Sequence, residues 1–583
     1  MSQTGDSAMF GVVKIQSHSV NPSDLPFAFA LGGRCGLELR APKRYTFAPS
    51  ISFTAAGIRV GVENLRLTRR CHRAGKLGFR LQLRIYNTLS RQKEPFEPLV
   101  SGKVSLYVCG VTVYDYSHVG HARVYVFFDV VRRTLRHFGY DVKYVRNFTD
   151  VDDKIIRRAN ENGETCDALT SRFIEAFHQD VDRRLECEAP DIEPRVTTHM
   201  PEIISMIQEI IARGHAYVVP GDADSLPGGK DVYFEVSSFP TYGALSGRSQ
   251  DDNQEGASDR VQHDARKHNQ ADFALWKSAK VGEPQWESPW GQGRPGWHIE
   301  CSAMSCKHLG SAFDLHGGGK DLIFPHHENE IAQAIAANGD VFSRGWMHLG
   351  FLTIDAEKMS KSLGNFFTIR EVLDRYHPQV LRYFLLTAHY LHPLNFADKM
   401  LDETTRRVLY VYEKMALADE VLAQNPPYVL DKLPDVVERA QTALLHALAD
   451  DFNTPQALAA LSEPLSALAH ALQKPKLAAN LPMITAVRAL IAQAGALLGV
   501  FHRPPQQVAD EIVETVRDRL FPHGSENLRE VQELMLQRQQ ARQDKDWAAA
   551  DVLRAKLTER NVEVRDARDA STWRPQLVEQ ITE

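Results

Sequence analysis

An α/β pattern of apolar positions opens the organised part of the chain, over residues 83–395. Residues 104–113 form an apolar run rich in β-branched side chains, which predicts a buried strand, and residues 142–148 form a second such run. Between them, apolar side chains recur at helical spacing over residues 124–138, and Gly139 follows where a helix would end. A strand, a helix and a strand make the nucleotide-binding half of a doubly wound parallel sheet, so we predict a Rossmann-like α/β domain.

Three further regions interrupt or follow this domain. Residues of about 195–280 are expected to be an insertion between the two halves of the sheet, and the polar stretch 246–272 within it predicts a long, mobile surface loop. Residues 396–504 predict a helical bundle, and residues 505–583 predict a small C-terminal module. Leu and Ala at helical spacing place the helices of the bundle at 400–424, 434–475 and 484–500.

Residues 1–82 differ in character from the rest of the chain. They contain many Arg and Lys, few acidic residues, several Ser and no sustained periodicity. This composition suits either an organelle transit peptide or an extension that is disordered or derives from translated upstream sequence. Because no clear amphipathic helix is present, we favour the second interpretation.

Composition narrows the class of protein. A chain of 583 residues should hold about three or four domains. We expect no apolar run to be long enough to span a bilayer. The net charge of −6 argues against indiscriminate binding of polyanions but permits local basic patches. The seven cysteines are scattered without a CxxC pair, which indicates reduced thiols and possible metal ligands. We expect a cytoplasmic monomer without a membrane segment.

Two short segments indicate activation of a carboxylate by ATP. His118-Val119-Gly120-His121 follows the first strand, and Lys358-Met359-Ser360-Lys361-Ser362 comes much later in the chain. Attack on an α-phosphate needs hydrogen-bond donors and cations around the developing phosphate charge, and these segments contain both. The chain has no GxGxxG and no Walker lysine, which excludes an ordinary dinucleotide site and a P-loop. Either histidine alone would be interpreted as part of a polar loop.

A metal site is one interpretation of a His/Glu pair near residue 326. Pro325 is expected to open a helix on which His326 and Glu330 share a face. Cys109, at the end of the first strand, and Cys301 would complete a zinc site, because strand ends converge in this fold. The alternative is that both cysteines are buried core thiols, and spacing alone leaves the two interpretations open. The neighbouring residues 327 and 328 are expected to point to other faces.

A cluster of carboxylates follows the second strand. Residues 149–154 contain three aspartates and a lysine. They would either position the amine of a ligand or cap the next helix, and we favour the cap.

Several longer motifs carry a family resemblance. The segments 107–121, 296–302, 316–330, 358–362, 451–455 and 545–551 match, in order, the blocks of one family. With these motifs the chain resembles the class I aminoacyl-tRNA synthetases, and within them the cysteinyl-tRNA synthetase family. Val111 and Val119 are mild departures from its first block. The resemblance covers roughly residues 83–575, without the polar loop.

The resemblance implies a function and a set of site residues. ATP and L-cysteine would give cysteinyl-adenylate, and the cysteine would then pass to the 3′ end of tRNA(Cys), with Mg²⁺ accompanying ATP. The zinc ligands would be Cys109, Cys301, His326 and Glu330. The cysteine pocket would include Gly110, Thr112, Thr149, Trp297 and His316. The ATP site would contain His118, Gly120, His121, Gly318, Asp321 and Lys361, with Gly318 in a flexible glycine run at 317–319. Catalysis would rest on His118, His121, Lys358 and Lys361.

The C-terminal module contains cations beside an aromatic residue, an arrangement that suits splayed single-stranded bases. The alternative from the residues alone is a charged helix with Trp547 buried. The resemblance implies contact with the tRNA anticodon through Arg542, Trp547, Asp551 and Asp566.

Three other functions compete with this interpretation. A cysteine ligase that acts on an amino sugar would share both ATP motifs, but it should lack residues 505–575. A noncatalytic regulatory paralogue is disfavoured by intact His118, His121 and Lys361. A plain zinc-dependent RNA-binding module would not need the ATP motifs.

Overall fold

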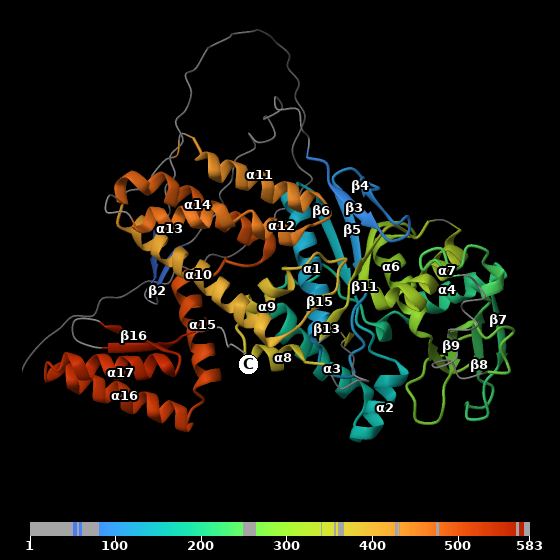
Figure 1. The fold of residues 1–583 in the computed structure, drawn as a ribbon. Coiled ribbons are helices and arrows are strands. Elements are labelled where there is room, and N and C mark those ends of the chain that lie inside the picture. Colours follow the sequence, from blue (N-terminus) through green and yellow to red (C-terminus); the bar gives the residue numbers. More distant parts are fainter. Residues whose placement is uncertain are drawn as a thin grey trace, which may run out of the picture. The chain divides into compact units, whose positions relative to one another are not determined.

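The computed structural model describes most of the chain after residue 80 (Figure 1). The described residues are 51–54, 57–60, 81–248, 264–339, 341–354, 357–358, 366–425, 430, 432–473, 477–566 and 571–576. Lys361, most of the expected polar loop and most of the 1–82 extension lie outside these residues. Before residue 81 the described part of the extension is a short hairpin, formed by β1 (Ile51–Thr54) and β2 (Gly57–Val60).

A four-stranded parallel sheet with the order β12-β11-β5-β6 forms the centre of the α/β region, which confirms the predicted fold class. Its strands are β5 (Lys103–Val108), β6 (Asp141–Arg146), β11 (Phe313–Gly319) and β12 (Ser343–Leu349). The chain leaves β5 for β6 on one side and returns to β11 on the other. The carboxyl ends of β5 and β11 therefore flank the point where the strand order reverses, which is where this architecture binds ligands.

The first strand is shorter than the predicted 104–113. Beyond Val108 the ladder is not continuous, because Gly110 donates its N–H to the side chain of Asn147 and Thr112 makes only an isolated bridge with Thr149. The shorter strand places Cys109 at the carboxyl edge of the sheet.

Alternation along β5 decides which side chains reach the site. Leu106 and Val108 pack in the core that contains α1 (Val119–His137), while Tyr107 and Cys109 belong to a separate buried cluster with residues of α6 (Trp297–Leu309) and α7 (Glu328–Asn338). Figure 1 shows α1 beside the strands of the sheet. The period of two in a strand thus places Cys109 on the α6/α7 side.

The insertion folds around an antiparallel sheet with the order β10-β9-β8-β7. Its elements are α4 (Met200–Ala212), β7 (Ala216–Pro220), β8 (Lys230–Phe234), β9 (Phe273–Ser278) and β10 (Gly293–Pro295). The expectation of a long surface loop over 246–272 is wrong at its end. Asp272 is buried and accepts hydrogen bonds from the Val236 N–H (3.0 Å) and the Tyr217 hydroxyl (2.8 Å). The Asn269 N–H is a third donor at 3.0 Å, and a buried carboxylate with three donors is a structural residue.

Smaller elements complete the α/β region. They are β3 (Arg84–Asn87), β4 (Gln92–Pro95), α2 (Asp153–Asn162), α3 (Cys166–Phe177), the π-helical turn His178–Arg184, β13 (Leu352–Ile354), β14 (Glu357–Lys358) and β15 (Leu394–Asn395). Asp152 caps α2 by accepting from the Lys154 N–H at 2.8 Å. The helix-cap interpretation of the aspartate cluster is therefore confirmed for this residue.

The helical region that follows shares one apolar core with α1 and the central sheet. Its helices are α8 (Ile369–Leu373), α9 (Pro378–Leu385), α10 (Asp398–Ala423), α11 (Asp435–Ala449), α12 (Thr454–Ala459), α13 (Ser462–Gln473) and α14 (Leu477–Leu498). The single helix expected at 434–475 is wrong, because Asp451 and Phe452 adopt positive φ angles that end α11. Buried Asp451 accepts from Tyr86 N–H and the Tyr390 hydroxyl, which ties this break to the sheet domain.

One helix contradicts the expectation that no segment is apolar enough to span a bilayer. Residues Ala479–Leu498 of α14 pass that test by length and composition. Ile484, Val487 and Ile491 are nevertheless buried in the shared core, so α14 is a core helix of the fold.

A small C-terminal module has an apolar core of its own. It contains α16 (Glu526–Gln543), α17 (Trp547–Glu559), β16 (Val562–Asp566) and β17 (Ser571–Pro575), and α15 (Pro505–Leu520) leads into it. The two helices pack on each other beside the antiparallel strand pair (Figure 1).

Candidate active site and metal centre

A buried cluster of thiols, imidazoles and a carboxylate lies at the carboxyl edge of β5. Cys109 Sγ is 3.7 Å from Cys301 Sγ and 3.4 Å from Glu330 Oε1. His326 Nε2 is 3.0 Å from the same Glu330 oxygen. All four side chains are buried, and their ligand atoms lie within 4.8 Å of one another. The structure thus brings together the four residues that the sequence named as candidate ligands.

The start of α7 differs from the expected regular helix. Regular α-helix begins only at Glu328, and the preceding residues Ile323–His327 form a π-helical turn in which Phe324 has non-helical angles. Pro325 therefore precedes α7 instead of lying in its first turn. The Trp297 ring stacks on His326 with centroids 4.3 Å apart, and this stacking helps to hold the imidazole against Glu330.

His327 also points into the cluster, so the expectation that it faces elsewhere is wrong. Its Nε2 lies 3.4 Å from Cys109 Sγ, and its Nδ1 lies 2.7 Å from His348 Nε2. His348 Nδ1 in turn lies 2.8 Å from the Thr88 hydroxyl. Sequence reasoning missed His348, which lies in none of the motifs. Glu328 does face away, and it accepts the N–H groups of Gly243, Leu245 and Ser246.

The electrostatics of the cluster favour a bound cation. Burial, with the nearby Cys301 and Glu330, raises the pKa of Cys109 well above its usual value, while the hydrogen bond with Cys109 lowers the pKa of Cys301 to about 6. Burial alone would raise the pKa of Glu330, but the charges and hydrogen bonds of His316 and His326 outweigh it and hold that pKa well below its usual value. Two thiolates side by side in a buried place would repel each other, so a bound cation would stabilise them.

The donor set fits a metal ion with soft preferences. A tetrahedral zinc site with its usual bond lengths places ligand atoms about 3.3–3.8 Å apart, close to the sulfur–sulfur and sulfur–oxygen distances seen here. Polar atoms with no hydrogen-bond partner among the described residues also lie here, on the side chains of Tyr107, Asn147, Glu300 and His316. Two thiols, an imidazole and a carboxylate in one buried place fit a metal site. A second, overlapping group contains Cys109, His316, His327 and Glu330.

The residues expected to contact cysteine lie around this cluster. His316 Nε2 is 2.9 Å from Glu330 Oε2, and the Thr149 hydroxyl donates to Glu300 Oε2 at 2.9 Å. Gly110 follows Cys109 directly, and Thr112 bridges to Thr149. Their proposed contacts with an amino acid stay a prediction. Glu300 is a further candidate for contact with the amino acid, and the sequence analysis did not single it out.

The two histidines of the first motif form the N-terminal cap of α1. His118 Nδ1 accepts from the His121 N–H at 3.3 Å, and His121 Nδ1 accepts from the His118 N–H at 3.1 Å. The rings stack with centroids 3.6 Å apart. Because Nδ1 accepts in both neutral rings, the ring proton lies on Nε2. The cap therefore prepares two Nε2–H donors, with Gly120 between them, at a helix N-terminus that attracts phosphate.

The glycine run 317–319 is a strand and not a flexible loop, which corrects the expectation. Gly317 pairs with Val108 on one side and Met347 on the other. A Cβ added at Gly317 would lie 2.0 Å from the Phe128 ring, so α1 packs directly on this backbone. Gly318 lies at the same end of β11, and Asp321 is exposed in the turn that follows.

Comparison with known proteins identifies the family. Residues 95–406 match the family model described as the tRNA synthetases class I (C) catalytic domain, residues 444–502 match the DALR domain, and residues 529–574 match the cysteinyl-tRNA ligase anticodon binding domain. The chain is 50% identical over 501 residues to the cysteine–tRNA ligase of Anaeromyxobacter dehalogenans, covering 85% of this chain and 100% of that protein. The chain belongs to the cysteine–tRNA ligase family. It is therefore an aminoacyl-tRNA synthetase, a ligase that forms aminoacyl-tRNA.

Two other comparisons agree. The chain is 46% identical over 505 residues to the chloroplastic/mitochondrial cysteine–tRNA ligase of Arabidopsis thaliana, covering 85% of this chain and 87% of that protein. The Mycobacterium tuberculosis methionyl-tRNA synthetase in complex with methionyl-adenylate superposes with a TM-score of 0.52 at 17% identity, covering 71% of this chain and 93% of that one. The second likeness shows the class I fold alone.

The family's anticodon-binding module presents an exposed tryptophan. Trp547 is 58% exposed, which excludes the alternative in which it is buried, and the Arg542 guanidinium lies 6.0 Å from its ring centroid. Asp566 binds Arg538 through two contacts of 2.8 Å and Arg542 through one of 2.8 Å. These cations hold the pKa of Asp566 well below its usual value. Asp551 is exposed on α17, one turn after Trp547.

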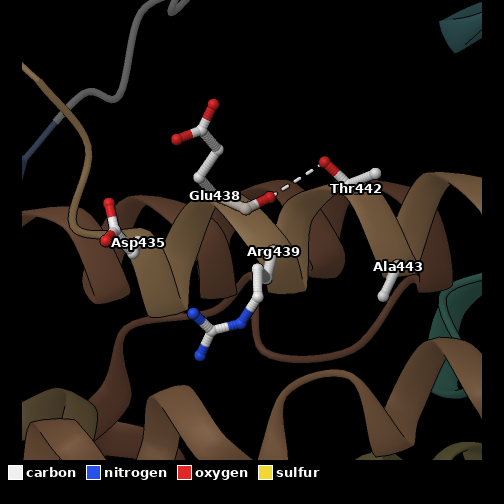
Figure 2. A pocket seen from close by; sticks show the side chains of 5 residues that line it. All are labelled: Asp435, Glu438, Arg439, Thr442 and Ala443. Atoms are coloured by element: carbon white, nitrogen blue, oxygen red, sulfur yellow. Dashed lines mark hydrogen bonds between the residues drawn. The ribbon is translucent and has the colours of Figure 1, made fainter.

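A surface hollow on α11 lies outside the candidate active site and metal centre. Figure 2 shows that its lining comes from a single helix, with the Thr442 hydroxyl donating to the Glu438 carbonyl at 2.9 Å. No residue of the buried cluster or the ATP motifs lines it.

Proposed function

We propose that this enzyme activates L-cysteine with ATP and transfers it to the 3′ end of tRNA(Cys), using the buried cluster to select the thiol. The observation that carries the proposal is the meeting of Cys109, Cys301, His326 and Glu330 at the strand edge that also leads to His118 and His121. A thiol-rich site beside a phosphate-binding helix end joins recognition of cysteine to the chemistry of ATP.

Cys109, Cys301, His326 and Glu330 would hold one Zn²⁺, which, when bound, supplies a soft Lewis acid that prefers a thiolate to a hydroxyl. The chain's own residues would shape the rest of the pocket. Trp297 covers one side of His326, and Gly110, Thr112, Thr149 and His316 border the cluster. Serine would leave the site without its preferred sulfur, so discrimination at this step needs no editing domain.

The ATP residues would act on the phosphates. The Nε2–H groups of His118 and His121 would donate to phosphate oxygens as charge develops, and Lys358 and Lys361 would supply cations from the opposite side. Gly120 and Gly318 would let the nucleotide approach the backbone, and Asp321 would accept from the ribose. Mg²⁺ would accompany ATP as the partner of its phosphates.

Exchange of pyrophosphate into ATP tests this function. We expect exchange that depends on cysteine and is not supported by serine or alanine. Charging of transcript tRNA(Cys) then separates a tRNA ligase from a ligase that acts on an amino sugar. Exchange without any tRNA charging would contradict the second half of the proposal, and absence of exchange would contradict the first.

Trp547 offers a test of tRNA recognition. We expect Trp547→Ala to leave cysteine-dependent exchange unchanged and to weaken tRNA charging at limiting tRNA, because a stacked base contributes about 1–3 kcal/mol. Tyr410→Ala, which removes a half-exposed aromatic ring from α10, is the matched control. Equal charging by the two variants would show that Trp547 does not contact the anticodon.

We further propose that the enzyme is a cytoplasmic monomer. The five cysteines in the described part of the chain are free thiols, which supports a reducing compartment. Light scattering after size-exclusion chromatography measures the oligomeric state, and fractionation of the source cells measures the compartment.

A further inference from the structure

A buried arginine in the second turn of α1 donates hydrogen bonds to main-chain carbonyl groups of two other segments. Arg123 is 3% exposed. One of its terminal nitrogens donates to the carbonyls of Gly350 (2.7 Å) and Phe351 (2.9 Å), and the other donates to those of His389 (3.3 Å) and His392 (2.6 Å). Among the described residues Arg123 has no ion pair, so its guanidinium is held by carbonyl oxygens alone.

The segment 389–392 is bound along its whole length. The Tyr390 carbonyl accepts from the Gly350 N–H at 2.8 Å, and the Leu391 carbonyl accepts from Lys320 Nζ at 3.1 Å. A Cβ added at Gly350 would lie 2.5 Å from a carbonyl oxygen of this segment, so glycine permits the close approach. Four successive carbonyls thus join α1, the end of β12 and the turn after β11.

These contacts lie at the entry to the second ATP motif. β13 begins two residues after Gly350, and it pairs with both β15 and β14, which ends at Lys358. Beyond residues 359–365 the chain returns to α1, where the Val119 N–H donates to the Phe367 carbonyl at 3.0 Å and the Ile369 N–H donates to the Ser117 carbonyl at 2.9 Å. The first two turns of α1 and the residues just before them therefore hold both flanks of the motif.

We propose that Arg123 is a positioning residue for adenylate formation, which couples the helix of His118 and His121 to the strands that carry the lysine motif. The inference rests on the proposed function, because it assigns those two motifs to opposite sides of ATP. The return flank is joined to α1 and the residues before it by main-chain bonds, whereas the hydrogen bonds from α1 to residues 350 and 351 of the entry flank come from the side chain of Arg123. Arg123 touches no reacting atom in this arrangement and acts through Lys358 and Lys361.

Arginine suits this task better than lysine. Its planar fork presents donors in several fixed directions, whereas an ammonium group is a compact point with three donors. Lysine at residue 123 would keep the charge but would not reach both carbonyl pairs together. A misplacement of about 1 Å far from the chemistry can lower a rate by about 100-fold.

Arg123→Lys, compared with Arg132→Lys, tests the proposal. Arg132 is equally buried on the same helix, but it binds Asp191 and the Ala189 carbonyl, away from both ATP motifs. We expect Arg123→Lys to lower the kcat of cysteine-dependent exchange about 10- to 100-fold with an unchanged KM for cysteine and unchanged metal content. Arg132→Lys should lose thermal stability to a similar degree and keep its kcat.

Two further measurements separate positioning from general damage. In a Lys361→Ala background, Arg123→Lys should cause little additional loss, because it acts through that lysine. Trypsin should cleave after Lys358 or Lys361 faster in Arg123→Lys than in wild type or Arg132→Lys, and this readout needs no activity.

Equal kcat losses in Arg123→Lys and Arg132→Lys would overturn the inference, as would fully additive losses with Lys361→Ala. If the wild-type enzyme showed no cysteine-dependent exchange, the proposed function would fail. The tryptic cleavage rates would then decide whether Arg123 anchors the motif, with equal rates in all three proteins overturning the inference.

Discussion

Replacing Cys301 with serine is expected to remove the bound metal and the affinity for cysteine together. Cys301 Sγ lies 3.7 Å from Cys109 Sγ inside a buried cluster, so a hydroxyl at this position leaves a hard, poorly ionised group where a soft cation needs a thiolate. The expected rise in the KM for cysteine is more than about 100-fold, because losing only an outer-shell partner of a metal site already costs about 10- to 100-fold.

The measurement is metal content after desalting, together with the kinetics of pyrophosphate exchange. Wild-type enzyme should contain one metal ion per chain. Cys306→Ser is the matched control, since Cys306 lies on the same helix, contacts Asn338 and is outside the cluster. Fully active wild-type enzyme without metal, or a Cys301→Ser variant with normal metal content and normal cysteine KM, would contradict the assignment.

The His118→Asn variant is expected to keep the stability of the fold and to lose most of its activity in pyrophosphate exchange. Asparagine is among the best N-cap residues, and its oxygen can accept the His121 N–H as His118 Nδ1 does now. It does not place a donor where His118 Nε2–H would meet a phosphate oxygen. Loss of one preorganised donor lowers kcat about 100- to 1,000-fold.

Thermal unfolding and exchange kinetics, measured on the same preparations, check this expectation. His118→Ala serves as the comparison, because it loses the cap as well and should be less stable by about 0.5–2 kcal/mol. Exchange by His118→Asn near the wild-type rate would show that the imidazole is only a cap. A loss of stability in His118→Asn as large as in His118→Ala would show that asparagine does not replace it.

Local patterns in the sequence determined the parts of the fold that depend on neighbours along the chain. The periodicity over 124–138 predicted a helix that the structure has at Val119–His137, and the alternation between strands and helices predicted the parallel sheet. The family motifs pointed to Cys109, Cys301, His326 and Glu330, which the structure brings together. The exposure of Trp547 was left open by the residues, because amphipathic patterns do not distinguish a buried tryptophan from one kept free for a ligand.

Only the tertiary structure decided how distant segments meet. His327 faces Cys109 because a π-helical turn rotates the chain before α7, and spacing along an ideal helix does not predict that rotation. Gly317 is a glycine because Phe128 of α1 packs on its backbone, a contact between residues far apart in sequence. In the sequence Arg123 is one polar position of an amphipathic helix. Its four carbonyl partners belong to Gly350, Phe351, His389 and His392, far along the chain. Helix periodicity is local, whereas the partner of a buried polar group is chosen by the packing of the whole domain.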